Sequence, residues 1–233
     1  MAKNLSVIVP AYNEERAIKS SIESLIVNLS AAVTNFEVVI VNDGSADRTA
    51  AIIAEMAGLE PRIKVIQRWR NHGFGAAIML GFANAQFEYL LINPVDNVVS
   101  ADELQQLFKA IENSDIVAGV RQKRSDYSYF REFCSTVLKY LVRLFFGLKM
   151  KDIGWVALYR KDKLRSLRVR TEYEFTLAEI LVRAKKSGYR IKELAVHYSP
   201  RTSGRHTGAN LRAITSILRD LVRVRLEMWL NKQ

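Results

Sequence analysis

The sequence has few of the residues that mark a secreted, membrane-spanning or linker-rich protein. One cysteine among 233 residues, Cys134, excludes an internal disulfide and fits a reducing compartment. The apolar helical pattern around Cys134 predicts buried packing. Four prolines and no Ser- or Gly-rich tract argue against a long linker. No apolar run reaches the ~18 residues of a membrane span, and no signal peptide precedes the first strand pattern. We therefore expect a cytoplasmic protein with one main domain over 1–208 and a helix over 209–233.

Positive charge is concentrated in the second half of the chain. Residues 1–120 hold 9 Lys or Arg against 14 Asp or Glu, a net charge of −5. Residues 121–233 hold 26 against 10, a net charge of +16. A basic half of this kind suits a polyanion or an anionic membrane surface. No zinc-finger spacing or RNA-binding aromatic motif accompanies the charge, so we expect no nucleic-acid partner.

Apolar segments alternate with helical patterns along the first half. We expect strands at 5–9, 36–41, 63–66, 89–93 and 116–120. We expect helices at 15–29, from Ser45 or Asp47 to 57, at 76–85 and at 102–113. In the second half we expect helices at 130–146, 174–186 and 210–230 and strands at 155–159 and 189–196. Alternation at this pitch predicts an α/β protein with a mostly parallel sheet covered by helices on both faces.

Polar and turn-forming residues follow the first two expected strands. The first strand runs into Pro10-Ala11-Tyr12-Asn13-Glu14, and the second runs into Asn42-Asp43-Gly44-Ser45. In an open α/β sheet, ligands bind at the carboxyl ends of the strands. The polar side chains of both segments are therefore expected to face one crevice.

The order of these segments resembles the family-two inverting glycosyltransferases, whose hallmarks are Pro-x-Tyr-Asn-Glu and Asp-Asp-Gly-Ser. Asn71-His72-Gly73-Phe74-Gly75 looks like the third segment of that family. Three later segments are similar to the branch that contains the dolichol-phosphate mannose synthases and the undecaprenyl-phosphate glycosyltransferases: Lys151–Trp155, Glu179–Glu193 and Arg201-x-x-Gly204. The resemblance therefore covers nearly the whole chain.

The resemblance implies a glycosyltransferase A-type, Rossmann-like fold with amphipathic helices at the C-terminal side. It implies transfer of a sugar, with inversion, from a UDP- or GDP-sugar to a polyprenyl phosphate. The residues that match the donor-nucleotide site are Pro10, Tyr12, Glu14, Asn42, Asp43, Gly75 and Asp96. Those that match the catalytic positions are Asp152, Glu179 and Arg201, and Arg205 and His206 join Arg201 as candidate ligands of the acceptor phosphate. Gly75 has a second interpretation as part of a tight turn.

Two departures from the family pattern bear on the metal. Pro94 stands where the first Asp of Asp-x-Asp is expected, which leaves Asp96, and Asn42 replaces the first Asp of Asp-Asp-Gly-Ser. Mg²⁺ tolerates one or two carboxylates together with phosphate and water, so Mg²⁺ or Mn²⁺ bound through Asp96 is one hypothesis. Basic residues that neutralise the phosphates are a second hypothesis, and a relative with changed or lost activity is a third.

The need for a general base depends on the acceptor. A polyprenyl phosphate is already an anion, whereas a sugar or peptide hydroxyl would need a base to accept its proton. Asp152 is the first candidate for that base and Glu179 the second. Asp152 could instead be a turn carboxylate, and Glu179 could pair with Arg183 four residues on.

The helices expected at 130–146 and 210–230 are amphipathic. Basic residues such as Arg212, Arg219 and Arg223 accompany the apolar stripe of the last helix, and Arg225 falls inside that stripe. The two helices could lie in an anionic membrane interface, or they could pack on each other or across a homodimer. Trp69 and Trp155 are expected in the core.

Overall fold

The computed structural model describes residues 3–122, 129–153, 155–173, 175–197 and 211–230. Its centre is a seven-stranded sheet with the order β3-β2-β1-β4-β6-β5-β7. The strands are β1 (Asn4–Ala11), β2 (Asn35–Asp43), β3 (Ile63–Arg68), β4 (Tyr89–Ile92), β5 (Ile116–Arg121), β6 (Ala157–Arg160) and β7 (Ile191–Val196). All neighbouring strands are parallel except β6, which runs antiparallel to both β4 and β5.

Helices cover both faces of the sheet, because successive side chains of a strand point to opposite faces. On β1, Leu5, Val7 and Val9 face a core shared with α1 (Ile18–Ala32), α2 (Thr49–Leu59) and α4 (Ala101–Ile111). Ile8 faces the opposite core. Five helices contribute buried residues to that second core: α3 (Phe74–Asn84), α5 (Tyr129–Phe146), α6 (Lys161–Arg165), α7 (Thr176–Lys186) and α8 (Leu211–Leu230).

This architecture confirms the predicted α/β fold with a mostly parallel sheet. The expected strands and helices are present with boundaries shifted by a few residues, and the short helix α6 is an addition. Asp47 contributes to the start of α2 as expected, since its carboxylate accepts a hydrogen bond from the Thr49 N–H at 2.9 Å. The antiparallel insertion of β6 had no counterpart in the sequence-based prediction.

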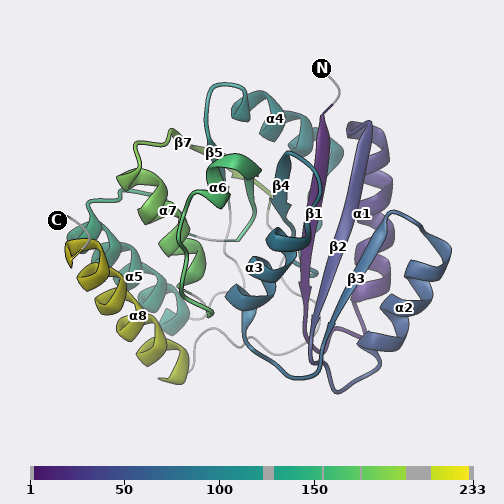
Figure 1. Cartoon of the computed structure of the whole chain (residues 1–233), viewed down its shortest axis with the longest axis horizontal. Coiled ribbons are helices and arrows are strands. Elements are labelled where there is room, and N and C mark those ends of the chain that lie inside the picture. The colour runs from purple at the N-terminus through teal and green to yellow at the C-terminus, as the bar shows by residue number, and fades with distance from the viewer. Residues whose placement is uncertain (1–2, 123–128, 154, 174, 198–210, 231–233) are drawn as a thin grey trace.

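The helices α5 and α8 lie side by side at the end of the molecule remote from β3 (Figure 1). Ion pairs and hydrogen bonds attach α8 to α7: Arg183 pairs with Glu227 at 3.1 Å, and the Lys186 ammonium donates to the Met228 carbonyl at 2.9 Å. Cys134 on α5 is half-buried rather than buried. In the part of the chain that the structure describes, no helix combines the length and the apolar character needed to cross a bilayer.

Candidate functional site

The carboxyl ends of β1, β2, β3 and β4 meet at one edge of the sheet (Figure 1). The register pairs Ala11 of β1 with Asn42 of β2, and Asp43 of β2 with Arg68 of β3. The loops that follow these strands therefore start side by side, about 4.8 Å apart from strand to strand. The structure thus brings together the segments around Tyr12 and Asp43, as the sequence predicted, and the Asp96 segment follows the neighbouring strand β4.

Hydrogen bonds link the loop after β1 to the loop after β2. Asn13 has a φ of 55°, and its side-chain oxygen accepts from the Ala46 N–H at 2.8 Å while its own N–H donates to Ser45 Oγ at 2.9 Å. The left-handed conformation suits Asn better than most residues. The Glu14 N–H donates to Thr49 Oγ1 at 2.8 Å. These bonds fix the segment that carries the exposed Tyr12 ring and the half-buried Pro10 and Glu14.

Asp47 is the hydrogen-bond acceptor that ties these two loops to α2. Partial burial favours the neutral acid, but hydrogen bonds from the Thr49 hydroxyl, the Thr49 N–H and the Glu15 N–H outweigh it and hold the pKa of Asp47 below its ordinary value. The carboxylate therefore stays charged near neutral pH and keeps the loop geometry.

Asp43 connects the loop after β2 to the loop after β3. Its buried carboxylate accepts hydrogen bonds from the backbone N–H groups of His72 and Gly73, the latter at 2.8 Å, and pairs with Arg68 Nη1 at 3.2 Å. Gly44 follows with a φ of 74°, and a Cβ there would lie 2.4 Å from the carbonyl carbon of Arg70. The residue predicted to hold the donor base or ribose thus also shapes the neighbouring loop.

Asn42 is fully buried, and the protein uses both ends of its side chain. The amide nitrogen donates to Gln67 Oε1 at 2.8 Å, and the amide oxygen accepts from Ser45 Oγ at 2.5 Å. An aspartate could not donate to Gln67, which gives a physical reason for Asn at this position. Its predicted contact with a donor stays a prediction.

The loop after β4 is organised by Asn93 and carries Asp96. Asn93 is buried, donates to the Pro94 carbonyl at 3.0 Å and accepts from the Val99 N–H at 3.0 Å. Asp96 is half-buried in this loop. Among the described residues, no three His, Cys, Asp or Glu side chains gather as they would around a metal ion. Asp96 is therefore one carboxylate at the predicted diphosphate position rather than part of an all-protein metal site.

Gly75 allows close packing between α3 and α7. A Cβ at this position would lie 1.9 Å from Thr176 Oγ1, and the neighbouring Ala76 N–H already donates to the Glu172 carbonyl at 2.7 Å. The start of α3 is thus covered by the segment before α7. The packing explains the glycine, and the predicted contact of Gly75 with a donor stays a prediction.

Asp152 lies in a buried polar cluster at the end of β5. Its carboxylate accepts from the Ile153 N–H at 2.9 Å and pairs with Arg121 Nη1 at 3.3 Å. The guanidinium of Arg121 lies 4.6 Å from the centre of the Trp155 ring, and Trp155 Nε1 donates to the Gly119 carbonyl at 3.2 Å. Trp155 is buried, as expected. Arg121 was missed, because one arginine after an apolar strand forms no motif.

Glu179 is enclosed by protein on all sides. Its carboxylate accepts from the Thr171 N–H at 2.8 Å, from Thr171 Oγ1 at 2.7 Å, from the Arg170 N–H at 3.1 Å and from Arg183 Nε at 2.5 Å. The pairing with Arg183 is the alternative that the sequence offered for this residue. These bonds hold the segment before α7 to the helix, so the geometry accounts for Glu179 by a structural role.

The basic residues predicted at the acceptor phosphate, Arg201, Arg205 and His206, lie outside the described residues. Trp69 differs from its prediction outright. The sequence placed it in the core, but 80% of its surface is exposed. It belongs to the loop between β3 and α3, next to the segment that Asp43 anchors.

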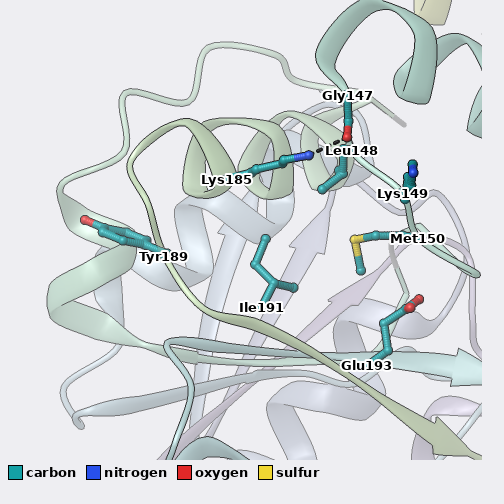
Figure 2. A pocket seen from close by; sticks show the side chains of 8 residues that line it. All are labelled: Gly147, Leu148, Lys149, Met150, Lys185, Tyr189, Ile191 and Glu193. Carbon is teal, nitrogen blue, oxygen red and sulfur yellow. Dashed lines mark hydrogen bonds between the residues drawn. The ribbon is translucent and has the colours of Figure 1, made fainter.

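A separate hollow of about 560 Å³ lies beside the edge strand β7 (Figure 2). Leu148, Met150 and Ile191 supply apolar walls, and the ammonium of Lys185 donates to the Gly147 carbonyl. None of the residues that the sequence predicted as site residues lines this hollow.

Residues 6–171 match the model of the family described as glycosyl transferase family 2. The match covers more than half of the chain and includes the loops after β1, β2, β3 and β4. The chain therefore belongs to glycosyl transferase family 2.

Several solved structures share the fold at low sequence identity. S. aureus TarS (residues 1–349) in complex with UDP-GlcNAc aligns over 95% of this chain and 66% of its own, with 21% identity and a TM-score of 0.65. A mannosyltransferase from Pyrobaculum calidifontis with GDP-Man and Mn²⁺ aligns over 94% and 64%, with 19% identity and a TM-score of 0.64. The chain thus spans just under two thirds of each of these two structures.

A third solved structure is glucosyl-3-phosphoglycerate synthase from Mycobacterium tuberculosis in complex with Mn²⁺, UDP-glucose and phosphoglyceric acid. It aligns over 96% of this chain and 80% of its own, with 17% identity and a TM-score of 0.75. At these identities the likeness establishes the fold, and the donors and acceptors belong to the other proteins.

Proposed function

We propose that this chain transfers a sugar, with inversion, from a UDP- or GDP-sugar to a polyprenyl phosphate at a membrane surface. Family membership supports a nucleotide-sugar donor. The three similar structures were solved with UDP-GlcNAc, GDP-Man and UDP-glucose, which supports the same class of donor. In this proposal Pro10, Tyr12, Glu14 and Asp43 frame the base and ribose, and the diphosphate extends towards Asp96.

The main observation in support of a lipid acceptor is a set of exposed apolar side chains on α5 and α8, called here the α5–α8 face. Its members are exposed large hydrophobic side chains at helical spacing: Phe133, Val137, Tyr140, Leu144, Leu218, Val222, Leu226, Trp229 and Leu230. The same two helices carry exposed basic side chains, among them Arg143, Arg219 and Arg225. Exposed apolar and aromatic side chains together with basic residues are typical of helices that lie in a membrane interface.

The Arg121–Asp152 pair supports an acceptor that is already an anion. The buried carboxylate of Asp152 is already engaged by the Arg121 guanidinium and the Ile153 N–H, an arrangement that suits a positioning role. A phosphate acceptor needs no proton removed before it attacks the anomeric carbon, so catalysis rests on positioning and on stabilisation of the departing diphosphate. Arg201, Arg205 and His206 are the residues that we propose for the phosphate charges.

A divalent cation fits this site in a limited way. Mn²⁺ is present in two of the similar structures, the P. calidifontis and M. tuberculosis complexes. Mg²⁺ bound at substrate phosphates commonly uses one or two carboxylates and several waters, a mode that one aspartate can serve. We propose that Asp96 would hold Mg²⁺ or Mn²⁺ together with the diphosphate, where the ion would neutralise negative charge.

Two alternatives differ in the acceptor and in activity. One is a transferase for a soluble or polysaccharide hydroxyl, in which Asp152 would become the base. The other is a weakly active or non-catalytic nucleotide-sugar-binding relative, which is favoured by Pro94 in place of an aspartate and by the engagement of Asn42 with Gln67.

Sedimentation with vesicles tests the membrane part of the proposal. We expect the chain to pellet with anionic vesicles and less so as salt rises, because basic residues near an anionic surface contribute about 1 kcal/mol each and salt screens them. Leu226→Ser with Trp229→Ser should weaken pelleting. The matched control is Val27→Ser with Leu59→Ser, which alters side chains that are 68% and 81% exposed on α1 and α2. If the wild-type chain does not pellet with vesicles and is a dimer when its sedimentation is measured without them, the α5–α8 face would be a homodimer interface instead.

A further inference from the structure

The loop between β3 and α3 presents an exposed cluster of an indole, a guanidinium and an imidazole. The guanidinium of Arg70 lies 4.3 Å from the centre of the Trp69 ring. Arg70 Nε donates to His72 Nε2 at 3.2 Å, and the His72 ring meets the Trp69 ring edge-on, with centroids 6.4 Å apart and planes at 84°. Each member of the cluster therefore contacts the other two.

This cluster rests on an anchored backbone rather than on an isolated loop. The N–H groups of His72 and Gly73 donate to the buried carboxylate of Asp43, and Arg68 pairs with the same carboxylate at 3.2 Å. The backbone of Arg70 also packs directly on Gly44. The position of Trp69 is thereby fixed relative to Asp43, the residue proposed to contact the donor base or ribose.

The Trp69 ring has one face covered by a cation and most of its surface open. Arg70 lies over one face, yet 80% of the side chain remains exposed to solvent. A planar aromatic group that stacks on an open indole stabilises the complex.

The sheet order indicates which part of a nucleotide sugar would reach this ring. The order β3-β2-β1-β4 puts the Asp96 loop and the Trp69 loop at opposite ends of a row of four strands. The distance between the starts of the two loops is therefore three inter-strand spacings of about 4.8 Å each. With the diphosphate near Asp96 and the ribose side near Asp43, the base end of the donor points towards β3. Trp69 is the exposed tryptophan in the loop at that end.

We infer that Trp69 stacks on the nucleobase of the donor and that Arg70 and His72 are positioning residues for its ring. The inference rests on the proposed nucleotide-sugar donor and adds a residue that the family motifs do not include. Stacking tolerates any base, so Trp69 would increase affinity for UDP and GDP alike and leave the choice between them to hydrogen bonds elsewhere in the site.

The test is titration of the full chain with UDP and with GDP. Calorimetry measures the Kd, and tryptophan fluorescence reports on the ring. We expect Trp69→Ala to raise the Kd of the bound nucleotide by about tenfold, within the range for loss of one stacking contact. Trp69→Phe should keep most of the affinity, because it retains an aromatic face. Leu59→Ala, which removes an 81% exposed apolar side chain on α2, should leave the Kd unchanged.

Fluorescence locates the effect on the ring itself. Saturating nucleotide should quench the emission that is present in the wild type and missing in Trp69→Phe. An unchanged Kd in Trp69→Ala, with nucleotide still bound by the wild type, would overturn the stacking inference and leave the donor proposal standing. A wild-type chain that binds neither UDP nor GDP, with or without Mn²⁺, would overturn the donor proposal and the stacking inference together.

Discussion

Arg121 and Asp152 form a buried ion pair in which Nη1 lies 3.3 Å from each carboxylate oxygen. The two residues come from segments 31 positions apart in the sequence, the end of β5 and the segment before β6. The pair brings the aspartate that resembles a catalytic residue under the direct influence of a cation. Its chemical role therefore depends on Arg121 as much as on Asp152.

Asp152→Asn separates a positioning role from a base role. The substitution keeps the shape but leaves the charge of Arg121 without its carboxylate, which costs about 3 kcal/mol in typical buried pairs. With a phosphate acceptor we expect turnover to fall by less than about 100-fold, because removal of a true general base costs roughly 10²- to 10⁴-fold. Initial rates across pH measure this. A loss near 10⁴-fold that also removes the acidic limb of the profile would make Asp152 the base.

Glu179→Gln should act on stability and not on chemistry. The change removes the ion pair with Arg183 and weakens the bonds from Thr171 and Arg170, so we expect a loss of about 3 kcal/mol in urea unfolding. Glu227→Gln is the control, since that carboxylate is more exposed and should cost less. Unchanged stability combined with a lost turnover would contradict the structural role of Glu179.

Gly75→Ala and Gly58→Ala form a matched pair of glycine substitutions in two helices that follow one another in the chain. The added methyl at Gly75 would lie 1.9 Å from Thr176 Oγ1 and 2.5 Å from the Tyr173 carbonyl oxygen, and overpacking of this kind costs about 1–3 kcal/mol or more. At Gly58 on α2 nothing lies within 4 Å, and alanine should stabilise the helix by about 0.5–1 kcal/mol. Thermal melts compare the two. Equal melting temperatures would mean that α3 and α7 separate easily.

Asp220 on α8 gives stability a dependence on pH. Burial is the main cause that raises its pKa; Arg219 and Arg223 work against the shift, and Glu179 adds to it. A carboxyl with a raised pKa in the fold contributes stability below its unfolded pKa of about 3.9, and that stability is lost as pH rises through the folded pKa. Asp220→Asn should therefore melt above the wild type at pH 7 and level with it near pH 3.5. A lower melting temperature at pH 7 would show that the pairing with Arg219 outweighs burial.

The sequence predicted the layered sheet well, because each strand in the first half is a short apolar run followed by turn residues. Val38–Val41 is an example: four consecutive apolar residues, all buried, can be accommodated in a strand that is covered on both faces. The direction of β6 was beyond this reasoning. A four-residue strand has the same pattern whichever way it runs, and its place between β4 and β5 depends on contacts distant in sequence.

The place of a residue at the sheet was predictable where a motif surrounds it and not elsewhere. Asp43 lies at the strand edge that its motif implied, whereas Arg121 and Trp69 have no motif around them. The prediction of a buried Trp69 followed from the usual behaviour of tryptophan, and it is wrong because the loop after β3 directs the ring into solvent. The glutamate at 179 matched the family pattern in sequence, but the pattern could not reveal that Thr171 and Arg183 enclose its carboxylate.

The central claim is transfer of a sugar to a lipid phosphate, and one assay measures it directly. The full chain is incubated with radiolabelled UDP- and GDP-sugars, Mn²⁺ and anionic vesicles that contain a polyprenyl phosphate, the matching polyprenyl alcohol or neither. We predict that label moves into the lipid fraction only with the polyprenyl phosphate. Label transferred instead to a soluble hydroxyl acceptor, or to the polyprenyl alcohol as readily as to the phosphate, would contradict the account.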